Sequence, residues 1–421
     1  MTQLQKYRRL VLGLLIAAMA GLAVCGYLYL RDQVPDYILA AEGEETPVIF
    51  HTPLQLLIEE EAVEADSQDA SNIPGENLHM MATGTGQTSS GTCQIRCSLL
   101  GMIPLKTVQV ESTERKSVYA GGFPVGIYLK TEGILVIGTG EVEGLDGQTY
   151  EPAEHIVQTG DYIVGADGKA LEDKEELVEC INASEGRELN LEVLREGSLL
   201  EVAVTPVQAS DLGYKAGIWV RSDAQGVGTL TYVDKEGNFG ALGHGISDVD
   251  TSTLLSMKEG TLYEADVLSV TKGEKGKPGE LAGVIHYRDS SVLGTIEENR
   301  TTGIYGTAEE LLNMERGELY EVAYKQEVEP GAATILCCVD GTVKEYEIEI
   351  ESVDLNKKEV NKGMVIRVTD PELLEKTGGI VQGMSGSPVI QNGRLVGAVT
   401  HVFVQDSAKG YGIFAEDMIG Q

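Results

Sequence analysis

The spacing of apolar positions changes several times along this chain, and each change predicts a different kind of element. Residues 10–30 form an uncharged apolar run that follows Lys6, Arg8 and Arg9. A run of this length is about long enough to span a bilayer as a helix. Basic residues before such a helix predict that the N-terminus stays in the cytoplasm and the remainder is exported. We expect a cytoplasmic stub and signal anchor over residues 1–30, with a cleavable signal peptide as the alternative.

Apolar positions become sparse over residues 31–102. Glu59, Glu60 and Glu61 belong to an acidic stretch, and residues 83–91 are rich in Gly, Ser and Thr. This composition is typical of flexible linkers. We therefore expect an acidic and Gly/Ser-rich stalk between the anchor and the first folded domain, at a place suited to proteolytic nicking.

Residues 103–205 combine strand-like and helix-like spacing, which predicts a compact mixed α/β domain. A Gly-rich loop with the sequence Ala-Gly-Gly-Phe-Pro-Val at 120–125 leads into an apolar strand. Residues 173–183 carry apolar residues at helical spacing, and two strands follow. With Pro-Ala-Glu at 152–154 and Gly-Asp-Tyr-Ile at 160–163, this order of features resembles a PDZ domain of the bacterial exported kind.

The PDZ resemblance implies a peptide-binding loop made of Gly122, Phe123, Pro124 and Val125. The backbone amides of this loop would hold a peptide's terminal carboxylate, and the peptide would add a strand beside residues 125–129. The alternative is that these glycines form ordinary turns.

Residues 206–421 contain many short apolar runs separated by Gly, Asn, Asp, Lys and Pro. Short strands at this spacing favour one all-β unit, such as a pair of packed barrels. Helical spacing is confined to short segments near residues 308–313, 371–377 and 415–419. The predicted fold class is therefore mainly β, with an N-terminal transmembrane helix and a mixed α/β PDZ-like domain before the all-β unit.

The composition narrows the partners and cofactors. The formal net charge is -34, and a chain this acidic repels the phosphates of nucleic acids. The six cysteines form no C-x-x-C pair and no histidine clusters with them, so no metal site is indicated. We expect protein and membrane partners, and neither nucleic acid nor a cofactor.

Candidate chemistry begins with a serine between glycines, in the sequence Gln-Gly-Met-Ser-Gly-Ser-Pro at 382–388. An Asn-Gly pair between two apolar runs follows and predicts a tight hairpin. Gly383 and Gly386 let the backbone turn sharply, so that the amides of Gly383 and Ser385 can meet an oxyanion. The pattern predicts a nucleophile at Ser385, and a plain Gly/Ser-rich turn is the alternative.

A serine hydroxyl needs a base, and histidine is the usual one. Of the six histidines we rank His244 first, because its flanking glycines place it on a loop at the end of a strand. His401, just after the serine hairpin, ranks second, and we expect it to line the cleft. The carboxylate that orients the base is Asp248, Asp250 or Asp370, and sequence spacing does not decide among them. Since Asp370 precedes a proline, it also matches a helix N-cap.

Two segments resemble one known family closely. They are Leu-Gly-His-Gly-Ile-Ser-Asp at 242–248 and the stretch from Gly-Gly-Ile-Val-Gln-Gly-Met-Ser to Thr-His-Val-Phe-Val at 378–404. Together with the anchor and the PDZ-like domain, they are similar to the stage IV sporulation protein B family of membrane-associated serine peptidases. The resemblance covers essentially the whole chain apart from the stalk.

This resemblance implies a trypsin-like double β-barrel over 206–421, with Ser385 as nucleophile, His244 as base and Asp370 as the acidic member of the triad. It also implies export into the space between the forespore membranes and cleavage there of a membrane-bound regulator of an intramembrane metalloprotease. That cleavage would lead to activation of a late mother-cell sigma factor, and the family also processes itself. The competing hypothesis is a PDZ scaffold whose peptidase-like domain only binds.

Overall fold

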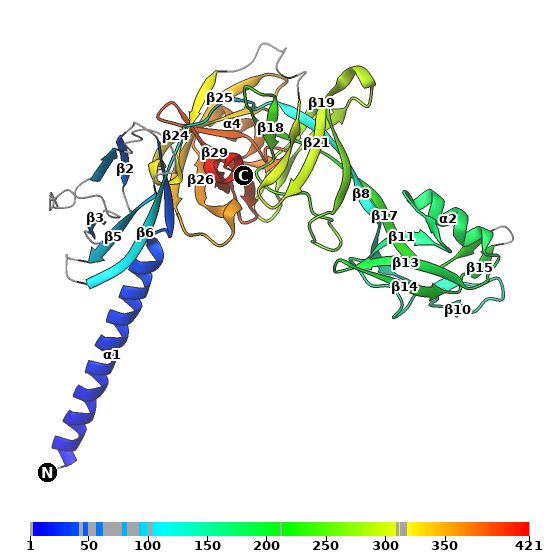
Figure 1. Cartoon of the computed structure of the whole chain (residues 1–421), viewed down its shortest axis with the longest axis horizontal. Helices are drawn as coiled ribbons and strands as arrows, with labels where there is room; N and C mark the ends of the chain where they lie inside the picture. Colours follow the sequence, from blue (N-terminus) through cyan, green and yellow to red (C-terminus); the bar gives the residue numbers. More distant parts are fainter. Residues whose placement is uncertain are drawn as a thin grey trace.

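In the computed structural model, the described residues are 3–41, 45–48, 56–61, 78–81, 92–99, 103–210, 213–308, 311 and 318–420. They lie mainly in β-strands, which confirms the predicted fold class. Figure 1 shows a long N-terminal helix at one end, a strand-rich body in the middle and a smaller unit at the other end. The molecule is therefore elongated, with its parts arranged in a row.

The N-terminal helix α1 (Gln3–Gln33) exposes apolar side chains such as Leu14 and Leu22 over most of its length. By length and composition, Tyr7–Gln33 is able to cross a membrane, with a mean hydropathy of 2.3. A signal sequence near an N-terminus passes the same test, so the helix alone is weak evidence of anchoring.

After α1 the chain enters a four-stranded sheet in the order β1-β6-β5-β3. The strands of this sheet and of a separate β2–β4 pair are β1 (Tyr37–Ala41), β2 (Glu45–Val48), β3 (Leu56–Glu61), β4 (Leu78–Met81), β5 (Thr92–Leu99) and β6 (Ile103–Thr113). Side chains from α1, β1, β5 and β6 share one apolar core, which includes Val34, Ile38 and Val108. We name this unit the N-terminal sheet.

The N-terminal sheet corrects the prediction of a stalk over residues 31–102. Residues 37–41 and 92–99 form strands, because the first is apolar throughout and the second alternates apolar with polar residues, which the acidic average composition hides. Of the predicted stalk, residues 42–44, 49–55, 62–77, 82–91 and 100–102 lie outside the described residues.

The two largest apolar cores of the central body lie within one closed hydrogen-bonded network of strands. The first barrel has Leu129, Leu230 and Leu262 in its core. Its strands are β7 (Ser117–Ala120), β8 (Pro124–Thr139), β17 (Ile218–Val233), β18 (Asn238–Ala241), β19 (Met257–Thr271), β20 (Gly279–Ile285), β21 (Val292–Arg300) and β22 (Gly303–Thr307). A short 3-10 turn, η1 (Asp289–Ser291), precedes β21.

The second barrel packs around Tyr346, Ile366 and Val389. Its elements are β23 (Leu319–Val322), η2 (Lys325–Glu327), β24 (Gly331–Cys338), β25 (Val343–Val353), η3 (Val360–Lys362), β26 (Met364–Val368), α4 (Pro371–Thr377), β27 (Val381–Gln382), β28 (Pro388–Gln391), β29 (Arg394–Phe403), β30 (Asp406–Phe414) and α5 (Ala415–Ile419). The hairpin expected from the Asn-Gly pair is present, since Gln391 of β28 pairs with Arg394 of β29. The pair of barrels matches the architecture that the resemblance implied.

The smaller unit is inserted into the first barrel. Strands β8 and β17 run out of that barrel side by side, and Val136 still pairs with Val220 where the smaller unit begins. Its other elements are β9 (Val142–Glu143), β10 (Thr149–Tyr150), β11 (Tyr162–Ala166), β12 (Lys169–Ala170), α2 (Lys174–Ala183), β13 (Leu189–Arg195), β14 (Ser198–Val204), β15 (Val207–Ser210) and β16 (Gly213–Lys215). Leu177 of α2 packs on Ile163 and Leu191 in a core of its own.

This insertion changes where the domain boundaries fall. The apolar core of the smaller unit lies between Ile134 and Val220, whereas the prediction placed the domain at 103–205. Strand β6 belongs to the N-terminal sheet, and β7 with the first half of β8 belongs to the first barrel. Periodicity along the chain does not reveal that one strand serves two units.

The shifted boundaries change the location of the loop with Gly122, Phe123, Pro124 and Val125. The Gly122 N–H donates to the Leu230 carbonyl at 2.8 Å, and Val125 pairs with both neighbouring strands of the first barrel. This corrects the predicted peptide-binding role of the four residues, because they lie in the barrel and not in the smaller unit.

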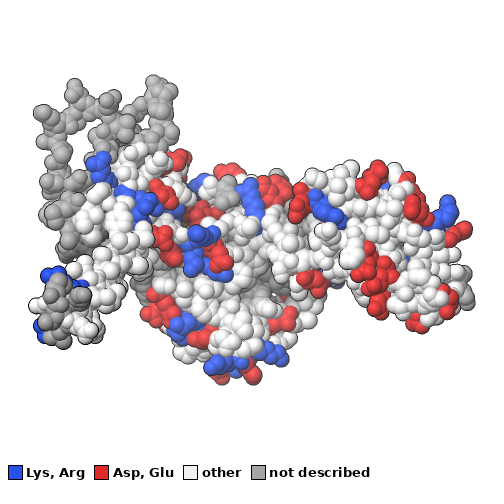
Figure 2. Space-filling view, turned by 90° about the horizontal axis from the view of Figure 1, so that it is seen from below, with Lys and Arg blue, Asp and Glu red and all other residues white. Residues whose placement is uncertain are grey.

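Figure 2 shows Asp and Glu side chains over much of the visible face of the smaller unit, with few Lys or Arg side chains among them. Within the smaller unit, the charges of Glu154 and Glu141 raise the pKa of Glu151. The middle of the molecule mixes both signs of charge. The excess of negative charge is therefore unevenly spread over this face.

Candidate active site

The turn that carries Ser385 joins β27 to β28 in the second barrel. Gly383 has φ +97° and Gly386 has φ +95°, which side chains other than glycine rarely adopt. A Cβ at Gly386 would also collide with the Thr229 carbonyl of the first barrel. Both glycines are therefore required by the conformation of the turn, as the sequence pattern indicated.

Strand β17 of the first barrel holds this turn. The Thr229 N–H donates to the Ser385 carbonyl at 3.0 Å, and the Thr229 hydroxyl donates to the Gly383 carbonyl at 2.8 Å. The buried Thr231 hydroxyl donates to the Gly386 carbonyl at 2.8 Å. Three carbonyls of the turn are thus hydrogen-bonded to one strand, which limits how far the Ser385 backbone can shift.

Ser385 and Ser387 differ in access. Ser385 lines a cleft between the barrels and its hydroxyl donates to the Thr400 carbonyl at 2.7 Å. Ser387 is fully buried, and its hydroxyl has no hydrogen-bond partner within the described ranges. Only Ser385 can meet a substrate in the cleft.

His244 lines the same cleft, on the loop that follows β18 (Asn238–Ala241). Its Nδ1 lies 2.9 Å from the Gly245 carbonyl oxygen, so Nδ1 carries the proton and Nε2 is left as an acceptor. Burial lowers the pKa of His244 below its ordinary value, despite the opposing effect of the Gly245 carbonyl. The imidazole is therefore neutral at pH 7 and able to accept a proton.

His401 lies beside His244 in the cleft, with ring centroids 4.8 Å apart and ring planes tilted by 36°. Burial of the covered face, with the nearby charges of His244 and Lys362, lowers the pKa of His401 to about 4. His401 therefore lines the cleft, as expected, and packs against the candidate base.

Asp370, expected as the acidic member of a triad, instead caps helix α4 (Pro371–Thr377). Its Oδ1 accepts from the Leu373 N–H at 3.0 Å and its Oδ2 from the Glu347 N–H at 3.4 Å. No interaction within the described part of the chain joins Asp370 to His244. The contacts of Asp370 are therefore those of a helix cap, as one interpretation of the sequence predicted. They are not those of the triad acid that the resemblance implied.

The other two candidate acids, Asp248 and Asp250, contact Arg221 and not His244. Asp248 is buried and pairs with Arg221, and it accepts the Thr251 N–H at 2.9 Å. Asp250 is exposed and contacts the same arginine at 3.0 Å. Among the residues that the structure describes, no carboxylate is hydrogen-bonded to His244, and the Gly245 carbonyl occupies the Nδ1 position.

The cleft has a volume of about 490 Å³ and lies between the barrels, with Ser385 and His244 both in its wall. A glycine-bounded serine, a neutral histidine and two packed β-barrels together define the class of serine peptidases with a two-barrel fold. Residues 212–419 match the SpoIVB peptidase S55 family. That domain belongs to this family, and the chain is a serine peptidase.

Comparison with solved structures adds little beyond this. The chain is similar to the inactive form of the Rv3671c protease, with 15% identity over 46% of this chain and 82% of that one, at a TM-score of 0.24. The active form of the same protease, from M. tuberculosis, gives 16% identity over 47% and 73%, at a TM-score of 0.25. At TM-scores this low, neither structure supports a conclusion about this chain. No curated protein matches the chain.

Sequence reasoning missed the residues that support the site. Thr229 and Thr231 lie more than 150 residues before the turn that they hold, and only strand pairing brings them there. The one local signal is that two threonines alternate with apolar residues in the uncharged stretch 227–233. The role of the Gly245 carbonyl cannot be predicted from sequence, since every residue has a backbone carbonyl.

We predict that Asp370→Asn keeps kcat/KM within a few-fold of the unchanged protein. Asparagine caps a helix about as well as aspartate does, so the role seen in the structure is preserved. A triad carboxylate changed to its amide would instead lose about 10⁴-fold in kcat. Peptide hydrolysis by the purified variant, with thermal unfolding as a control for stability, distinguishes the two roles. A loss of the larger size would restore Asp370 to the triad.

We also predict that the acid limb of the kcat/KM profile lies below pH 6.5, the ordinary pKa of histidine. Burial disfavours the charged imidazole, so the neutral base survives to lower pH and activity is lost only as the pH falls through the lowered value. The measurement is kcat/KM from about pH 4 to pH 9. His401→Gln serves as the control and should keep the limb, which would show that it belongs to His244. A limb above the ordinary histidine value would contradict the assignment.

Proposed function

We propose that Ser385 attacks the scissile carbonyl and that His244 Nε2 takes the proton from the Ser385 hydroxyl. For this step the hydroxyl turns from the Thr400 carbonyl toward His244. The protonated imidazole then gives its proton to the leaving amine. The observation that carries the proposal is that both side chains line one cleft, with His244 held as a neutral base.

We propose that the N–H groups of Gly383 and Ser385 stabilise the oxyanion. The Ser385 N–H donates to no acceptor in the part of the chain that the structure describes, so it is available for this role. Two such donors in a site without bulk water contribute several kcal/mol of transition-state stabilisation, about 3 kcal/mol for each donor.

The Gly245 carbonyl takes the place of a triad carboxylate in this proposal. It fixes the tautomer of His244 through the Nδ1 hydrogen bond of 2.9 Å. A neutral carbonyl stabilises the imidazolium less than an anion does, so catalysis with this dyad is slower than with a full triad. The packed ring of His401 helps to keep His244 in place.

For the biological role we propose the signalling cleavage that the family name implies. The substrate is a membrane-bound regulator of an intramembrane metalloprotease, in the space between the forespore membranes, and its cleavage leads to activation of a late mother-cell sigma factor. The family match and the apolar N-terminal helix support this role. Self-cleavage belongs to the same proposal.

We further propose that the smaller unit is PDZ-like and binds a peptide. Helix α2 packed on antiparallel strands gives the kind of surface to which a peptide adds as a strand. The competing function, a scaffold whose peptidase domain only binds, is disfavoured because Ser385 and His244 are both present in an open cleft.

We predict that Ser385→Ala abolishes measurable peptide hydrolysis, because the nucleophile is removed while the scaffold stays intact. A fluorophosphonate probe followed by peptide mapping should label Ser385 in the folded protein and nothing in the variant. Ser387→Ala is the matched control and should keep labelling and hydrolysis. N-terminal sequencing of the expressed pair reveals any self-cleavage, and full sporulation activity in Ser385→Ala would favour the scaffold instead.

A further inference from the structure

The active cleft contains two histidines, His244 and His401, and their lowered pKa values keep both neutral. No Asp, Glu, Lys or Arg of the described residues lines it. Much of its wall is apolar and comes from Ile127, Val227, Leu242, Ile380, Val381 and Val402. This is unexpected for a chain with a net charge of -34, whose surface is rich in carboxylates.

Two charged groups close to His401 are already paired. Glu359 and Lys362, which influence His401 electrostatically, form an ion pair of 2.8 Å with each other and do not line the cleft. A charged substrate side chain that enters the cleft would therefore lose water without gaining a partner, which is costly.

One wall of the cleft is built by second-barrel residues that flank Ser385 and its hydrogen-bond partner in the chain. Ile380 and Val381 precede the serine turn, and Val402 and Val404 follow Thr400, whose carbonyl accepts the Ser385 hydroxyl. The substrate residue that supplies the scissile carbonyl becomes bonded to Ser385, so its side chain must lie against this wall.

We propose that the cleft selects substrates with an aliphatic, uncharged residue on the carbonyl side of the scissile bond, and that Ile380, Val402 and Val404 determine this preference. The proposal rests on the serine peptidase function stated above. Apolar pockets discriminate by about 10-fold to 200-fold per methylene group, and an unpaired charge is excluded at least as strongly.

The test uses the full chain in detergent and a peptide library in which the residue before the cut varies. Mass spectrometry of the products should show aliphatic residues at that position at least about 10-fold more often than Lys, Arg, Asp or Glu. Equal cutting after charged residues would overturn the proposal.

If the library is not cut, the rates of labelling by two phosphonates, with a valine-like and a lysine-like side chain, decide the preference. Faster labelling by the valine-like probe supports the proposal, and equal or reversed rates overturn it. Failure of every probe, fluorophosphonate included, would remove Ser385 as nucleophile and is thus distinguishable from a wrong preference.

A variant pair tests the wall directly. Val404 and Val178 are each 52% exposed, but Val404 lies at the cleft and Val178 lies on α2 of the smaller unit. Val404→Asp should raise cutting after Lys and Arg, relative to aliphatic residues, by about 10-fold, because it supplies the missing partner. Val178→Asp should leave the ratio unchanged. An unchanged ratio in Val404→Asp would contradict the proposal that this wall determines the substrate preference.

A second inference comes independently from the N-terminal sheet. Strand β1 pairs in parallel with β6 from Tyr37 with Gln109 to Ala41 with Thr113, although some sixty residues separate the two strands in sequence. The fully buried Val34 and Ile38 pack in one core with Val108 of β6. The helix is therefore attached to the rest of the chain by contacts as well as by the covalent chain.

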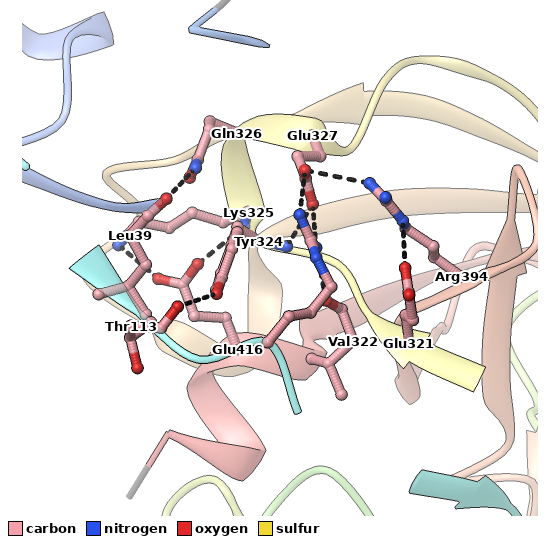
Figure 3. Close-up of polar contacts among 11 residues, drawn as sticks. Leu39, Thr113, Glu321, Val322, Tyr324, Lys325, Gln326, Glu327, Arg394 and Glu416 are labelled. Atoms are coloured by element: carbon pink, nitrogen blue, oxygen red, sulfur yellow. Dashed lines mark hydrogen bonds and ion pairs between the residues drawn. The ribbon is translucent and has the colours of Figure 1, made fainter. Parts of the chain in front are cut away.

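The second barrel adds contacts to the same strand, which Figure 3 shows. The Gln326 side-chain amide donates to the Leu39 carbonyl. The Lys325 ammonium lies 3.8 Å from the centre of the Tyr37 ring and pairs with Glu416 at 3.4 Å. Because the side chains of Lys325 and Glu416 are 6% and 4% exposed, water barely competes for this pair.

Hydrogen bonds also join the C-terminal end of β6 to the second barrel. Arg115, just after β6, forms two hydrogen bonds of 2.9 Å to the Glu327 carboxylate, and both side chains are 6% exposed. The Tyr324 hydroxyl donates to the Thr113 carbonyl at 3.4 Å. The partner strand of β1 is thus part of one rigid arrangement with the second barrel.

We propose that residues 3–41 stay bound to the peptidase when the chain is cut between Ala41 and Thr92. A cut there removes the covalent link but none of the contacts of β1 described above. The peptidase then remains attached to its N-terminal helix, and release from a membrane needs separation of β1 from β6.

To test this, residues 66–72 are replaced with the recognition sequence of an added protease, and the full chain is cut in detergent. The two fragments should co-elute in gel filtration at micromolar concentration. Ile38→Asp should separate them, and the milder Tyr37→Ala should increase dissociation, whereas Ile103→Asp, at a 48% exposed position of β6, should not. Separation of the unchanged fragments, or co-elution that all three variants leave intact, would overturn the proposal.

Discussion

The chemistry of this peptidase depends on the hydrogen bonds between strand β17 and the serine turn. Thr229 and Thr231 bind the carbonyls of Gly383, Ser385 and Gly386, and the turn can approach the strand because Gly386 has no side chain. These bonds join the two barrels at the point where the nucleophile lies. Since His244 follows a strand paired with β17, the base and the nucleophile are positioned from the same strand.

The same strand continues into the smaller unit. Residues 218–221 of β17 pair with β8 in that unit, and residues 224–231 lie in the barrel beside the cleft. The pairing of β8 with β17 is interrupted between Arg221 and Asp223 and continues on both sides, so the connection is made of two paired strands and not of one flexible linker. The insertion therefore places the smaller unit in direct continuity with the serine turn, whereas the N-terminal sheet meets the second barrel through a buried ionic network.

The site also shows how a base is oriented without a carboxylate. The Gly245 carbonyl accepts from Nδ1 of His244, and burial keeps the ring neutral. The carboxylates that could have served are engaged by a helix terminus and by Arg221. An uncharged cleft is consistent with this arrangement, because an anion beside His244 would raise its pKa and add a charge that substrates would have to accommodate.

Local pattern determined much of this protein. The apolar run predicted the helix, the short alternating runs predicted a mainly β chain with two barrels, and the glycines around Ser385 predicted its turn, because each depends on neighbours in sequence. Tertiary structure decided the rest. The partners of His244, the location of Gly122 to Val125 in a barrel and the folding of β1 against β6 depend on strand register across long separations, which no local period encodes. The hydrogen bond from the Thr229 hydroxyl to the Gly383 carbonyl joins residues 154 apart, and only closure of the barrels brings them together.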